Sequence, residues 1–175
     1  MKLHHILILA SAGFLSACKQ APDKPAAAPG PSAALSEVLA AAPAGEPQPI
    51  HLIRHTAKPG DKITIQGRIM GSARPFVDGR ALFILGDTET LTPCNEVPGD
   101  ECDTPWDVCC DTPEAKKLGT ATVQIVDGEG RVIKEGIEGI GGLEKLASVT
   151  VTGTVAEGSS PDLLLVNASA IRTNK

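Results

Sequence analysis

Apolar side chains between residues 63 and 171 recur at alternate positions in five short runs. Alternation with a period of two is typical of strands that bury one face. β-Branched residues enrich the two later runs, which strengthens the assignment to strands. Clusters rich in glycine, proline, aspartate and serine separate the runs and predict turns. The pattern therefore predicts five strands, near residues 63–69, 81–85, 121–125, 149–155 and 163–171.

One segment between the third and fourth runs has helical spacing. Leu143 and Leu146 lie three positions apart, which favours a short helix over residues 141–146. Gly67 and Gly153, each inside a strand, fit the bends of a small closed barrel. The order strand, strand, strand, helix, strand, strand resembles the OB-fold. This resemblance implies an all-β, five-stranded barrel with one short helix, and a β-sandwich of about seven strands is the alternative.

The N-terminal third differs in composition from the predicted barrel. Residues 19–49 contain seven prolines and many alanines, and they have few large apolar side chains. Such a segment buries too little surface to offset its ordering entropy, although residues 35–39 could form a turn or two of helix. We therefore predict a Pro/Ala-rich linker over residues 18–49. Residues 50–175, which have the size of one domain, form the barrel domain.

An apolar run from Ile6 to Leu15 is followed by Leu15-Ser16-Ala17-Cys18. The run is too short to span a bilayer, which needs about 20 apolar residues. Together with the basic start at Lys2, it resembles the signal peptide and lipobox of a bacterial lipoprotein precursor. The resemblance implies removal of residues 1–17, acylation of Cys18 and a place in the cell envelope. Lys19 after the acylated residue slightly favours the outer membrane.

The negative net charge of the chain limits the kinds of partner that we expect it to bind. The formal net charge is −5, and removing residues 1–17, which include Lys2 and no acidic residue, makes it −6. Nucleic-acid binding depends mainly on Lys and Arg neutralising phosphates, so we expect no nucleic-acid partner. Anionic lipid headgroups would also repel this chain. Membrane attachment is therefore expected through acyl chains on Cys18.

Residues 88–119, between the second and third predicted strands, form a connection far longer than a hairpin loop. An even number of cysteines in one exported loop indicates disulfides, and we predict two of them, preferring the pairings that do not join the adjacent cysteines. Trp106 in this insertion is interpreted as an apolar cover for the sulfur atoms. The insertion contains every cysteine of the predicted barrel domain: Cys94, Cys102, Cys109 and Cys110.

Metal binding is the alternative use of these four cysteines. Thiolates bind zinc or copper, and the insertion adds acidic residues, among them Asp100 and Asp103. His51 and His55 are four positions apart and could supply further ligands. The spacing of the cysteines argues against a metal site, because the gaps are seven, six and no residues. Structural zinc sites favour paired cysteines two to four residues apart.

Enzyme activity is disfavoured. Thiol redox chemistry at Cys109 and Cys110 is the least unfavourable case, yet Asp107, Asp111 and Glu114 nearby would oppose a reactive thiolate. We recognise no other catalytic constellation and assign no catalytic residues.

A binding module is the function that the sequence favours. OB-folds commonly bind ligands on the face of their second and third strands and the adjoining loops. The corresponding residues here are Arg74, Phe76 and Asp78, together with Trp106. An envelope protein or a glycan is the expected partner. The stretch of residues 104–111 also resembles a segment of uncharacterised exported bacterial proteins, which implies a recurring type of loop but no activity.

Overall fold

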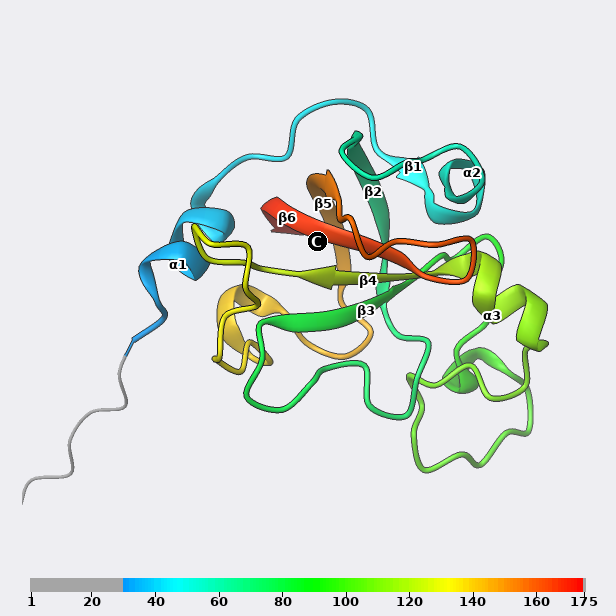
Figure 1. Cartoon of the computed structure of the whole chain (residues 1–175). Helices are drawn as coiled ribbons and strands as arrows, with labels where there is room; N and C mark the ends of the chain where they lie inside the picture. The colour runs from blue at the N-terminus through cyan, green and yellow to red at the C-terminus, as the bar shows by residue number, and fades with distance from the viewer. Residues whose placement is uncertain (1–29, 175) are drawn as a thin grey trace, which may run out of the picture.

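The computed structural model describes residues 30–174 and has a closed barrel of five strands at its centre (Figure 1). The strands pair in the order β2-β3-β4-β6-β5, and β5 pairs with β2 to close the barrel. Within this barrel β4 and β6 are parallel, and the other pairs are antiparallel. The predicted five-stranded barrel is confirmed. Its strands are β2 (Lys62–Ile69), β3 (Leu82–Gly86), β4 (Thr120–Gln124), β5 (Ser148–Val155) and β6 (Leu164–Thr173).

The barrel interior is filled by apolar side chains from every strand. Fully buried side chains come from all five strands, and most of the residues that alternate with them are only half-buried. Examples are Ile65, Phe83, Val123, Val151 and Val166. This is the arrangement expected for a small barrel, whose interior is packed and not hollow. The alternation that predicted the strands is therefore the same pattern that builds the core.

Two strand glycines permit the tight coiling of the barrel. A Cβ at Gly67 would lie 2.4 Å from the carbonyl oxygen of Gly86, and one at Gly153 would lie 2.4 Å from that of Asn167. The strand register also shifts between Thr152 and Gly153. The predicted bends are thus places where two backbones approach more closely than a side chain allows.

The segment before the barrel is folded against it from residue 32 onward. Helix α1 (Ala33–Ala40) begins at Ser32, whose hydroxyl accepts a hydrogen bond from the Leu35 amide. Leu35 is fully buried in the main core. The short strand β1 (Gln48–Pro49) then pairs with β2 and leads into helix α2 (Ile50–Arg54). The predicted linker therefore does not extend to residue 49, because apolar residues spaced along α1 pack onto β6 and the barrel.

Short helical elements occupy both long connections of the barrel. The helix predicted at 141–146 is a single 3₁₀ turn, η2 (Ile140–Gly142), after which Leu143 enters the core. The insertion contains a second 3₁₀ turn, η1 (Cys94–Glu96), and ends in helix α3 (Pro113–Gly119). In Figure 1 the insertion and α3 lie together at one side of the barrel, opposite α1.

Among residues 30–174, no helix has the length and hydrophobicity needed to cross a membrane. The predicted signal peptide and the acylation site Cys18 lie outside the described residues.

Candidate metal centre in the cysteine lobe

The insertion of residues 88–119, which we call the cysteine lobe, packs on the barrel through a small apolar core of its own. Leu91 and Val108 of the lobe and Met70, just after β2, are buried together. The Trp106 carbonyl also accepts a hydrogen bond from the Gly71 amide at 3.2 Å. The lobe is therefore positioned by the end of strand β2.

Backbone hydrogen bonds fold the two arms of the lobe side by side. The amide of Cys94 donates to the carbonyl of Asp107 at 2.8 Å, and the amide of Asn95 donates to the carbonyl of Pro105 at 3.0 Å. These bonds bring residues that are 13 and 10 positions apart into register. As a result, Cys94 at the start of η1 lies beside Cys109.

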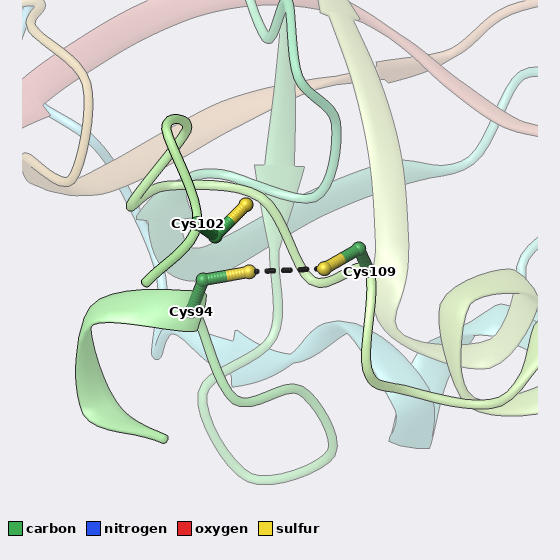
Figure 2. Close-up of side chains that lie close together, drawn as sticks. All are labelled: Cys94, Cys102 and Cys109. Carbon is green, nitrogen blue, oxygen red and sulfur yellow. Dashed lines mark hydrogen bonds between the residues drawn. The ribbon is translucent and has the colours of Figure 1, made fainter. Parts of the chain in front are cut away.

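Three of the four cysteines point their sulfur atoms toward one another (Figure 2). The Sγ atoms of Cys94 and Cys109 are 3.3 Å apart, and those of Cys94, Cys102 and Cys109 all lie within 4.8 Å of one another. Cys94 is buried, Cys102 is half-buried and Cys109 is exposed. The group thus reaches from the interior of the lobe to its surface.

All four cysteines are free thiols in the structure, so the prediction of two disulfides is not supported. The shortest Sγ–Sγ distance among them is 3.3 Å, well beyond the length of about 2.05 Å of a disulfide bond. The prediction rested on the even number of cysteines in one exported loop, which disulfides would hold in order. The small apolar core and the backbone hydrogen bonds between its arms provide the order instead.

A second group overlaps the first at the surface. Cys110 Sγ lies 3.9 Å from Cys109 Sγ and donates a hydrogen bond to Asp100 Oδ2 at 3.4 Å. The ligand atoms of Asp100, Cys109 and Cys110 lie within 4.8 Å of one another. Cys109 therefore belongs to both groups.

The surroundings of the thiols shift their pKa values in different directions. Burial, reinforced by the hydrogen bond with Cys109, raises the pKa of Cys94 to about 12. Hydrogen bonding with Thr104, whose hydroxyl is 3.2 Å away, lowers the pKa of Cys102. The carboxylate of Asp100 raises the pKa of Cys110. A metal ion that binds Cys94 must therefore displace a proton, as thiolate coordination generally requires.

The two predicted histidine ligands are not in either group. The ring Nδ1 of His51, on helix α2, lies 2.8 Å from Oδ2 of the buried Asp87. His55 is exposed at the end of the same helix. Within residues 30–174, the groups of three or more potential ligands consist of cysteines and Asp100, so the predicted role of the histidines is not supported.

The predicted ligand-binding residues lie in the lobe, in the case of Trp106, and in the neighbouring β2–β3 loop. Trp106 Nε1 donates to the carbonyl of Ala73 at 2.9 Å, and Lys145 Nζ lies 4.3 Å from the centre of the Trp106 ring. This attaches the lobe to the β2–β3 loop. Arg74, Phe76 and Asp78 of that loop border a surface hollow of about 350 Å³, in which Arg74 and Asp78 are exposed. Phe76 is mostly core, with its ring centre 6.1 Å from that of Phe83.

Sequence reasoning missed the residues that position the lobe. Met70 and Arg68 lie at the end of β2, and Arg68 forms an ion pair with Glu96 of η1. Helix α3 was also missed, although its signals are present. Thr112 caps the helix, and Pro113 occupies the first position.

Comparison with known proteins gives little further information. No protein-family model and no curated protein matches this chain. Among solved structures, the chain is similar to the hypothetical protein ygiW from E. coli, with 13% sequence identity and a TM-score of 0.40. The alignment covers 75% of this chain and 94% of that one. A likeness this distant assigns no property to the present chain.

Proposed function

We propose that this protein is a lipid-anchored envelope protein whose OB-like barrel carries a thiolate site for a soft metal ion, zinc or copper(I). The observation that carries the proposal is the convergence of Cys94, Cys102 and Cys109, whose sulfur atoms lie within 4.8 Å of one another. Cysteine thiolates are the ligands that these two metals prefer.

The sulfur separations suit a shared metal ion. A metal–sulfur distance of about 2.3 Å places the sulfur atoms of a trigonal or tetrahedral site about 4 Å apart. The Cys94–Cys109 separation of 3.3 Å and the limit of 4.8 Å for the three sulfur atoms bracket that value. The unfavourable spacing in the sequence is overcome because the Cys94–Asp107 and Asn95–Pro105 hydrogen bonds align the two arms of the lobe.

The expected compartment adds a second argument. An exported protein meets an oxidising environment, where clustered free thiols are converted to disulfides. Coordination to a metal would hold the thiols reduced and fixed. Thiol redox catalysis is less well supported, because Asp100 raises the pKa of the exposed Cys110 and so opposes the reactive thiolate.

The proposal is tested on the full chain, extracted from membranes without reductant. Metal content by mass spectrometry is expected to be about one zinc or copper per chain. Alkylation of the three converging cysteines, Cys94, Cys102 and Cys109, is expected only after chelation. Cys94→Ser should lose the metal, whereas Asp103→Asn, at an exposed carboxylate outside both groups, should retain it. Disulfide-linked lobe cysteines, or metal-free thiols that alkylate at once, would contradict the proposal.

Lipid anchoring is tested separately through Cys18. If the lipobox is processed, the wild-type chain remains in the membrane fraction and incorporates labelled palmitate. The variant Cys18→Ala should lose both properties while its barrel folds unchanged. Recovery of the wild-type chain from the cytosol with residues 1–17 intact would refute the anchoring.

Partner binding at the β2–β3 loop is the second candidate function. It is favoured by the hollow beside the lobe, where Arg74 and Asp78 offer opposite charges at the rim. A glycan with both donors and acceptors, or an envelope protein, fits this surface. Co-sedimentation of the full chain with purified peptidoglycan is the test for the glycan. Loss of sedimentation in Arg74→Ala supports this function, and absence of sedimentation in the wild type excludes this glycan.

A further inference from the structure

The two cysteine groups share one ligand and differ in their access to solvent. The inner group ends at the buried Cys94, whereas Cys109 and Cys110 of the outer group are exposed. Cys109 is common to both groups. A metal ion bound in the outer group could therefore move inward without leaving Cys109.

We propose that the lobe takes up and releases copper(I) through Cys110, which serves as an exchange ligand beside the resident Cys94, Cys102 and Cys109. The inference rests on the proposed metal-binding function and adds the identity of the metal and the route of its transfer. Copper(I) is favoured because the inner group offers three sulfur ligands, whereas structural zinc sites have four ligands.

The exchange conserves charge and oxidation state. Copper first binds the Cys109 and Cys110 thiolates, and bonds to Cys94 and Cys102 then form while the bond to Cys110 breaks. Cys109 and Cys110 each lose a proton to solvent when they first bind copper. In the exchange step Cys94 and Cys102 each release a proton, of which one is taken up by Cys110 and the other passes to solvent. Copper stays in the +1 state throughout. Release to an acceptor follows the same steps in reverse, with an acceptor thiolate or chelator meeting copper at the exposed Cys109–Cys110 edge.

Asp100 assists the outer group. Its carboxylate accepts the hydrogen bond from Cys110 at 3.4 Å, which orients that side chain toward Cys109. The exposed Glu101 follows Asp100 in the chain and adds negative charge around the entrance. Such a concentration of one sign of charge raises the local concentration of cations.

The experiment separates equilibrium binding from transfer. The full chain is loaded anaerobically with one equivalent of copper(I), and its affinity is measured by competition with a chromophoric copper(I) chelator. Stopped-flow absorbance then gives the rate of transfer to the same chelator. The variants are Cys110→Ser and Cys94→Ser, with Asp103→Asn as the matched control.

Cys110→Ser is expected to keep the stoichiometry and the affinity within about 3-fold, and to slow transfer by about 10-fold or more. Cys94→Ser removes a proposed direct ligand, so it is expected to lower the affinity by at least the roughly 100-fold that loss of an outer-shell partner can cost. Asp103→Asn should change neither the affinity nor the stoichiometry.

Each contrary outcome identifies what failed. A wild-type chain that binds zinc but not copper(I) overturns this inference and leaves the proposed function intact. If Cys110→Ser loses affinity as Cys94→Ser does, then Cys110 is a resident fourth ligand and the exchange route is wrong. Transfer from Cys110→Ser at the wild-type rate also overturns the route. A chain that binds neither metal refutes the proposed function itself.

Discussion

The barrel buries Phe83, Val123 and Val166 completely within a sheet closed by hydrogen bonds, whereas the cysteine lobe shares one small cluster in which Met70, Leu91 and Val108 are buried. Ordering each residue costs about 1–2 kcal/mol, and burial of apolar surface is the main compensation. The barrel has ample compensation of this kind. The lobe has little, and it places its thiols where a metal ion would add to its stability.

Because the barrel and the lobe have separate apolar cores, the two regions should open independently. Native proteins contain units whose opening free energies range from nearly zero up to the global value. The lobe is expected to be the low-stability unit and the barrel the high-stability one. Four substitutions test this division.

Phe83→Ala should have the largest effect and should act on the barrel alone. Phe83 is fully buried, and its removal should lower the global free energy of unfolding by about 3–5 kcal/mol. Denaturant titration measures this loss. Hydrogen exchange of the Cys94 and Asn95 amides should stay unchanged, because opening of the lobe leaves the barrel folded. Faster exchange at these amides would show that lobe and barrel form one cooperative unit.

Leu35→Ala tests whether helix α1 belongs to the barrel unit. Leu35 is fully buried in the main core, so the substitution should lower the global free energy of unfolding by about 2–5 kcal/mol. Ser36→Ala, at the exposed neighbouring position, is the control and should leave stability nearly unchanged. Equal stability of the two variants would mean that residues 33–40 act as a linker, as the sequence alone predicted.

Val108→Ala should weaken the lobe. Two methyl groups leave the small core, which is worth about 1.5 kcal/mol. Exchange of the Cys94 and Asn95 amides should accelerate accordingly, and added metal should slow it again, since a ligand that binds the closed lobe stabilises it. Unchanged exchange in this variant would show that the cluster does not order the lobe.

Trp106→Phe should have the smallest effect. It removes the hydrogen bond to the Ala73 carbonyl, which contributes about 1 kcal/mol, while most of the ring is retained. Slightly faster exchange is expected at the Gly71 amide, which bonds to the Trp106 carbonyl. A loss as large as that of Val108→Ala would mean that Trp106, and not the apolar cluster, is the main attachment of the lobe.

Most of the barrel could be predicted from the sequence because its strands alternate regularly. The alternation that identifies a strand, such as that of Phe83 and Leu85 in β3, is visible within the strand's own few residues. The five predicted strands therefore match β2 to β6 to within a few residues. Helix α1 was underestimated because its burial depends on β6, which is far away in the sequence. Composition alone gives no sign of such a long-range contact.

The cysteine lobe was harder to predict. The sequence identified the four cysteines and Asp100 as candidate ligands, but local spacing favoured disulfides over a metal. What brings Cys94 beside Cys109 is a pair of backbone hydrogen bonds and the packing of Val108 on Met70. The packing on Met70 depends on the chain just after strand β2, so it could be found only once the barrel was in place.

X-ray absorption at the metal edge, on the full chain purified with its native metal, tests the central claim most directly. The account predicts a first shell of three or four sulfur atoms at about 2.3 Å, and its loss in Cys94→Ser. A shell of nitrogen or oxygen atoms would contradict it, as would a metal-free chain with its lobe cysteines joined in disulfides.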